Sequence, residues 1–150
     1  MYIRYRIVYN HFEAKYEGVL DMENKKVISA VTRKQLIEDG DLIDITEKAR
    51  EAAFTYHTAI SRAAWAEMVE TSEEDAADGQ SEEGRLWDVL IMLRMAITTK
   101  VNAVSYTPHQ MVYYFILHKG GKPREVQLKA LFHPGDNLEP CMTILLPNED

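Results

Sequence analysis

The chain has 150 residues, of which 46% are hydrophobic and 27% are charged. These values are ordinary for a globular protein, exclude global disorder, and predict one domain over residues 1–150 with a core of its own. The formal net charge of −7 argues against a protein that follows nucleic-acid phosphates, so we expect no direct nucleic-acid binding. Arg4 and Arg6 interrupt the start of the chain and Cys141 has no disulfide partner, which predicts a cytoplasmic protein without membrane association.

The first elements are a strand and a short helix. Residues 2–9 alternate between two sets of side chains in the way that is typical of a strand. Thr32 followed by Gln35 forms a capping box, which marks the start of a helix, and Gly40 supplies its left-handed end.

Two further helices are expected before residue 71. Asp41–Ile45 forms a brief extended link or a small strand. Thr46 is placed to cap a second helix, and Thr58 to cap a third that runs to about Glu70.

An acidic segment then precedes the most apolar part of the chain. Residues 71–84 contain no apolar side chain larger than alanine, so they cannot offset the entropy of packing, and we expect a mobile loop or a frayed turn. The stretch from about 82 to 101 carries apolar residues on nearly every helical face. It predicts a buried central helix, with Trp87 in the core.

The last third of the chain predicts a sheet. Alternating and aromatic runs indicate three antiparallel strands at about 111–118, 125–132 and 141–146, whose dry face the central helix would cover. The expected fold is therefore α+β. It has three or four helices, including the central one, packed on a C-terminal three-stranded antiparallel sheet that residues 2–9 could extend.

The acids are unevenly placed. Residues 67–83 hold eight of them and no Lys or Arg, which favours a protein partner with a basic surface, and a nearby tryptophan would serve as an anchor. The candidate partner-binding residues are Trp65, Glu67, Glu70, Glu73, Glu74, Asp75, Asp78, Glu82 and Glu83.

Other candidate sites have ordinary structural explanations. None of the five histidines has the spacing of a metal site, although a hairpin could bring His118 and His133 together. Cys141 lacks the neighbours that make a thiolate, and a buried, unreactive side chain is expected. We therefore predict no catalytic residue, no metal and no cofactor.

Two alternatives remain open. Four carboxylates crowd one connection and could bind Mg²⁺, which would make the protein a small metal-binding or hydrolytic enzyme. In the second alternative the protein self-associates, with strand Met111–His118 pairing across a homo-oligomer. The four carboxylates are Asp39, Asp41, Asp44 and Glu47.

Over about residues 27–150 the sequence resembles an uncharacterised domain family of bacterial plasmids, integrative elements and phages, which leaves 1–26 as a leader outside the family. The resemblance implies no activity and no catalytic residue, but it implies a setting. Accessory proteins of mobile elements often inhibit host machinery. The expected function is therefore a non-enzymatic accessory protein that binds and inhibits a host nucleic-acid-handling or defence complex, of the anti-CRISPR or anti-restriction type. The stretches that carry the resemblance are TRKQLIEDGDLIDITEKAREAAF (32–54), GRLWDVLIMLRMA (84–96), VQLKALFHPGD (126–136) and EPCMTILLPNED (139–150).

Overall fold

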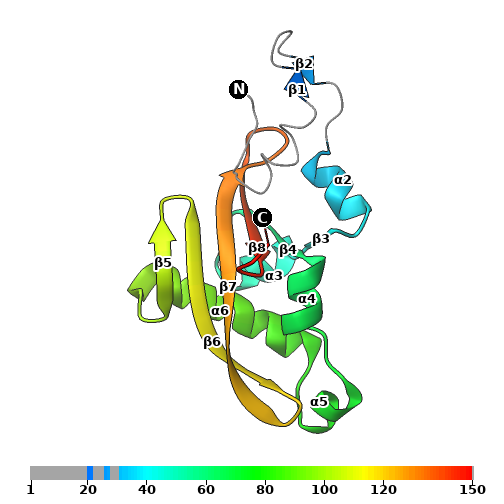
Figure 1. Ribbon diagram of the computed structural model, residues 1–150, viewed down its shortest axis with the longest axis vertical. Helices are drawn as coiled ribbons and strands as arrows, with labels where there is room; N and C mark the ends of the chain where they lie inside the picture. Colours follow the sequence, from blue (N-terminus) through cyan, green and yellow to red (C-terminus); the bar gives the residue numbers. More distant parts are fainter. Residues whose placement is uncertain (1–19, 22–25, 28–30, 150) are drawn as a thin grey trace.

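The computed structural model of the protein describes residues 20–21, 26–27 and 31–149. The strand predicted at residues 2–9 lies outside these described residues. Leu20–Asp21 (β1) and Lys26–Val27 (β2) pair as a small antiparallel sheet of their own. Residues 31–149 contain the main sheet and the helices that are labelled in Figure 1.

The main sheet has six strands, in the spatial order β3-β4-β8-β7-β6-β5. β4 and β8 run parallel and every other neighbouring pair is antiparallel, so the sheet is mixed. The predicted three-stranded antiparallel sheet is therefore wrong: its strands at about 111–118, 125–132 and 141–146 are the β6, β7 and β8 part of a wider sheet. In spatial order the strands are Leu42–Asp44, His57–Ser61, Pro140–Leu145, Lys122–Pro134, Gln110–Lys119 and Ala103–Thr107.

The described residues form five helices, one more than the sequence predicts at most. α6 crosses one face of the main sheet, and α5 lies beside the turn between β6 and β7 (Figure 1). The helices are α2 (Arg33–Glu38), α3 (Thr46–Glu51), α4 (Arg62–Met68), α5 (Glu73–Ala77) and α6 (Glu82–Thr99).

α6 is the long helix that the apolar pattern predicts, but it is not enclosed. One side packs into the core through Leu86, Val89, Leu90, Leu93 and Ala96. Full burial of a leucine or valine side chain contributes roughly 1.5–3 kcal/mol, so this side alone fixes the helix on the sheet.

The opposite side of α6 remains open among the described residues. Trp87 is 38% exposed and Met95 is 40% exposed, so the prediction that Trp87 lies in the core is wrong. The sheet covers only one face of the helix, and the flanking helices do not close over the rest. The polar hydroxyl of Tyr113 still reaches the buried side, where it donates a hydrogen bond of 3.0 Å to the Val89 carbonyl.

Of the three threonines predicted to cap helices, one does so and two do not. Thr32 caps α2, because its Oγ1 accepts a 3.0 Å hydrogen bond from the Gln35 amide, as predicted. Thr58 does not cap a helix: it lies inside β4, and Ser61 caps α4 instead. Thr46 is the first residue of α3 rather than its cap.

Candidate functional site

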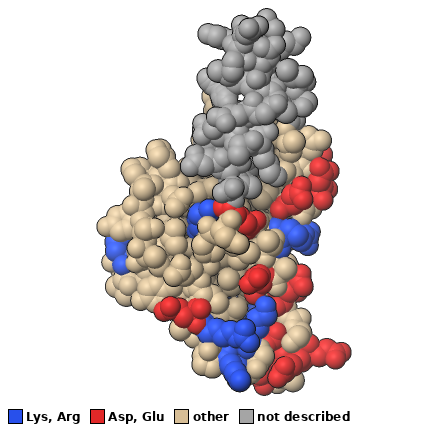
Figure 2. Space-filling view, in the orientation of Figure 1, with Lys and Arg blue, Asp and Glu red and all other residues tan. Residues whose placement is uncertain are grey.

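Seven of the eight acids between residues 67 and 83 are exposed. They lie on or just after α4 and α5 and at the start of α6, and in Figure 2 acidic side chains gather at the end of the molecule where Figure 1 places α5. We call this set the acidic surface. Its members are Glu67, Glu70, Glu73, Glu74, Asp78, Glu82 and Glu83.

The eighth acid, Asp75, is only 2% exposed and contacts the protein's own groups. Its Oδ2 accepts the Ser72 amide at 3.0 Å, and its Oδ1 accepts the Gly120 amide at 3.0 Å and lies 3.0 Å from Nη2 of Arg85. The two backbone amides, with the Arg85 charge, hold the pKa of the Asp75 carboxyl well below its usual range. Asp75 is therefore charged but is not accessible to a partner.

Arg85 completes this contact from the first turn of α6. Its Nη1 donates to the Glu70 carbonyl at 2.5 Å, and its Nη2 donates to the His118 carbonyl at 2.7 Å. These bonds join the end of α4, the start of α6 and the end of β6. The predicted mobile loop at 71–84 is therefore wrong: α5 occupies part of it, and the loop is fixed to the β6–β7 hairpin.

A basic group borders the acidic surface. The turn of the β6–β7 hairpin carries Lys119, Lys122 and Arg124, and Figure 2 shows Lys and Arg side chains beside the acids at this end of the molecule. Lys119 also donates a 3.0 Å hydrogen bond to the Glu67 carbonyl. The acids outnumber these cations, so the end of the molecule is acidic on balance with a basic margin.

The environments of the two tryptophans are the opposite of those predicted. Trp65 is half-buried and packs against the core, which leaves only part of its ring available. Trp87 is exposed beside the acidic surface: Lys48 lies 5.9 Å from its ring centroid, and the same Lys48 Nζ is 3.7 Å from Glu83. Glu83 and Trp87 are four residues apart, so they share one face of α6.

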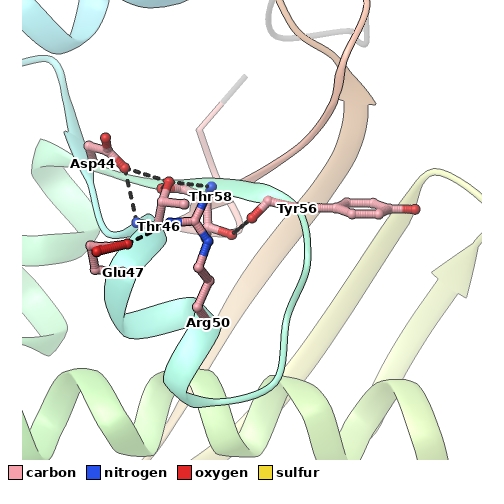
Figure 3. Close-up of polar contacts among 6 residues, drawn as sticks. All are labelled: Asp44, Thr46, Glu47, Arg50, Tyr56 and Thr58. Atoms are coloured by element: carbon pink, nitrogen blue, oxygen red, sulfur yellow. Dashed lines mark hydrogen bonds and ion pairs between the residues drawn. The ribbon is translucent and has the colours of Figure 1, made fainter.

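Two of the four carboxylates between residues 39 and 47 bind their own neighbours, and the other two, Asp39 and Asp41, are exposed. Asp44 accepts the Thr46 amide at 2.9 Å and the Thr46 hydroxyl at 2.6 Å, which satisfies the start of α3 (Figure 3). Glu47 pairs with Arg50 at 2.5 Å on the outer side of the same helix. Within residues 31–149 and the two short strands, no three His, Cys, Asp or Glu side chains are grouped as a metal site would require.

The β6–β7 hairpin does not bring His118 and His133 together. His118 pairs with Pro123 near the turn, whereas His133 pairs with Cys141 at the other end of β7. Ten residues of strand separate the two positions on β7, which corresponds to roughly 33 Å.

The strand proposed for self-association has strand partners on both sides over only part of its length. β6 pairs with β7 along its whole length, whereas β5 pairs with it only over residues 110–113. Over residues 115–119 none of the described strands pairs with that second side of β6. Self-association through this strand therefore stays a prediction.

A buried polar cluster joins α2 to β7 and β8. Arg33 donates to the Thr143 hydroxyl at 2.7 Å and to the Met142 carbonyl at 3.1 Å. Nε2 of His133 lies 2.7 Å from the same hydroxyl, and its Nδ1 lies 2.9 Å from the Pro134 carbonyl. These contacts fit a neutral imidazole that donates from Nδ1 and accepts at Nε2.

The pKa values of His133 and Cys141 in this cluster do not favour catalysis by the Cys141 thiol. Burial, with the charge of Arg33, lowers the pKa of His133 to about 3, so the ring is a poor proton acceptor at neutral pH. Burial raises the pKa of the Cys141 thiol to about 11. A cysteine nucleophile reacts as the thiolate, and a thiol with this pKa forms very little thiolate at neutral pH. The cluster therefore holds α2 on the sheet.

Comparison of the chain with models of protein families, with characterised proteins and with solved structures finds no match. Among the described residues, none of the helices is both long enough and apolar enough to cross a membrane.

Proposed function

We propose that the protein is a non-enzymatic binding protein that engages a protein partner with a basic surface through its acidic surface. In the setting that the resemblance implies, this partner is a nucleic-acid-handling or defence complex in a bacterial host cell. The acids would then lie where that complex receives the phosphates of its nucleic acid, and binding would inhibit it. The resemblance supplies the setting, and the acidic surface supplies the mode of binding.

The observation that carries the proposal is that the acidic surface is held in place. The Asp75–Arg85 pair and the Gly120 amide fix α5 against the hairpin, so neighbouring carboxylates keep their positions before a partner arrives. A surface that is already ordered loses less entropy on binding than a mobile loop would. Clustered charge of one sign also speeds the encounter with an oppositely charged groove.

Trp87 gives this surface an apolar anchor. Trp87 is 38% exposed and shares a face of α6 with Glu83. Tryptophans that a partner can enclose contribute strongly to protein interfaces. The basic margin at the hairpin turn restricts the partner further, because it favours a partner whose basic groove is bordered by acidic groups.

The test compares two variants that each lose three negative charges. E73Q/E74Q/D78N changes the acidic surface and leaves the buried Asp75 intact, whereas E38Q/D39N/D41N changes exposed acids at the end of α2. Each protein is immobilised and used to capture proteins from a bacterial lysate, at salt concentrations from about 0.05 to 0.5 M. The captured proteins are quantified by mass spectrometry.

We expect the wild type and the control variant to retain the same basic protein or complex, with retention falling as salt rises. Capture by the acidic-surface variant is expected to fall about tenfold or more. Adding Trp87→Ala to that variant is expected to reduce capture further. Equal capture by the two triple variants, or capture that salt does not affect, would exclude the acidic surface as the binding site.

A further inference from the structure

A cleft with a volume of about 510 Å³ lies far from the acidic surface. It is formed by the segment between α3 and β4, the C-terminal half of α6 and the β5–β6 hairpin. The acidic surface ends on α6 at Glu83 and the cleft begins there at Arg94, eleven residues later and roughly 17 Å away along the helix. The volume is within the usual range for a site that binds a small molecule.

Aromatic rings line this cleft at two depths. Phe54 and Phe132 are half-buried and form its inner part, whereas Tyr56 is 39% exposed and Tyr106 is 57% exposed at its rim. The Tyr56 ring meets the Phe132 ring edge-on, with centroids 6.4 Å apart.

A hydrogen bond to its carbonyl fixes Tyr56 in the segment just before β4. Its carbonyl accepts a 2.9 Å hydrogen bond from the Thr58 hydroxyl, and its ring points away from the contacts of Asp44 and Thr46 (Figure 3). The ring therefore reaches the cleft from a backbone segment that is already fixed. A planar ligand placed there would meet aromatic surface without first ordering the loop.

The charged groups of the cleft are both cations. Arg94 is held by hydrogen bonds from its Nη1 to the carbonyls of Ala52 and Ala53, at 3.1 and 3.2 Å. Nζ of Lys100 lies 5.0 Å from the centroid of the Tyr106 ring. No Asp or Glu from the described part of the chain lines the cleft, in a protein whose net charge is −7. The local charge therefore has the opposite sign to that of the whole molecule.

We infer that the cleft is a binding site for a small planar aromatic anion, with its ring against Tyr56 and Tyr106 and its acidic group at Arg94 and Lys100. Stacking on the rings selects a planar molecule, because offset and edge-on contacts between rings are favourable. Charge-assisted hydrogen bonds to the two cations select a carboxylate or a phosphate. A neutral molecule of the same shape gains only the first set of contacts.

The experiment titrates the intact protein with two anions and with their neutral counterparts. AMP and indole-3-acetate carry a phosphate and a carboxylate, whereas adenosine and indole-3-acetamide carry neither. Binding is followed by changes in the amide NMR signals of the protein. We expect at least one anion to bind with a Kd below about 1 mM and about tenfold more tightly than its neutral counterpart. The anion that saturates identifies the acidic group that the site prefers.

Two variants and one control place that binding in the cleft. Lys100→Met and Tyr106→Ser change exposed side chains at the rim, and each is expected to weaken binding of the anion about tenfold. Lys34→Met removes an exposed lysine on α2 and is expected to bind as the wild type does. The inference is overturned if neither anion binds below about 1 mM, if the neutral molecules bind equally well, or if Lys34→Met weakens binding as much as Lys100→Met.

Discussion

Asp75 on α5 and Arg85 on α6 form an ion pair of 3.0 Å in which both side chains are almost completely buried. The pair also receives the Gly120 amide from the β6–β7 turn, so three separate parts of the chain meet at one carboxylate. Buried charges are tolerated only when such partners satisfy them. Residues 71–84 have no large apolar side chain, and this ion pair is what holds them in a fixed position on the rest of the fold.

Arg85→Met is expected to lower the free energy of unfolding by about 3–5 kcal/mol, because Asp75 would remain buried without its cation. Asp75→Asn is expected to destabilise the protein as well, since Arg85 would then lack its carboxylate. Urea unfolding measures both effects, and Asp78→Asn is the control: that side chain is exposed, so its effect should stay within about 0.5 kcal/mol. If Arg85→Met unfolds at the same urea concentration as Asp78→Asn, the pair does not stabilise this end of the molecule.

The sequence reveals elements whose signals are local. The periodicity of α6 and the alternation of β6 and β7 lie within single stretches, and both predict the observed elements closely. β4 has no such signal, because its place depends on parallel pairing with β8, in which Thr58 lies opposite Met142. Without that distant partner, the sequence around Thr58 resembles the start of a helix. The predicted sheet therefore lacked β4, and it also lacked β3 and β5.

The sequence shows where the acids are grouped, but it does not show the contacts that hold them in place. The acids between 67 and 83 were found because charge is visible in the sequence. What fixes them stayed open. An arginine on a mostly apolar helix indicates that Arg85 needs an acidic partner, but no spacing rule selects Asp75 from the other acids or connects Gly120 to it. The local part of that arrangement was available: Ser72 and Asp75 form a capping box at the start of α5.

His133 is expected to make the stability of the protein depend on pH. Its pKa is about 3 in the folded protein and about 6.5 in the unfolded chain, so between these values only the unfolded chain binds the proton. Stability is therefore lost as the pH falls below about 6.5. Between pH 7 and pH 5 this one group is expected to cost about 2 kcal/mol.

The measurement is urea unfolding at pH 7 and pH 5. Other groups titrate in this range as well, so His133→Gln is compared with the wild type, and the drop in stability should be smaller in the variant by about that amount. His109→Gln changes an exposed histidine, and its drop in stability between pH 7 and pH 5 should equal that of the wild type. A drop of equal size in both variants would show that folding does not lower the pKa of His133.

Cys141 is expected to react slowly with thiol reagents while the protein is folded. It is the only cysteine of the chain, it is buried, and its pKa is raised to about 11, so very little thiolate is present at pH 8. With Ellman's reagent at pH 8, the folded protein should react about 100-fold more slowly than the same protein in concentrated guanidinium chloride. Equal rates would mean that the thiol is accessible and ionised, which would reopen a nucleophilic role.

Replacement of Ala53 by glycine is expected to stabilise the protein by about 0.5–1 kcal/mol. α2 and α3 end in the same way: the amides of Asp41 and Phe54 each bond back to a carbonyl five residues earlier, after one residue with a left-handed backbone. In α2 that residue is Gly40, with φ of +83°, and in α3 it is Ala53, with φ of 70°.

An alanine is strained in this conformation, whereas a glycine adopts it freely, so Ala53→Gly removes a cost that only α3 carries. Ala52→Gly is the matched control, because Ala52 has an ordinary φ of −83° and a buried side chain, and there glycine should destabilise the protein. Thermal unfolding of both variants decides the question. If the two glycines lower the melting temperature equally, the end of α3 does not require the left-handed conformation that the structure gives Ala53.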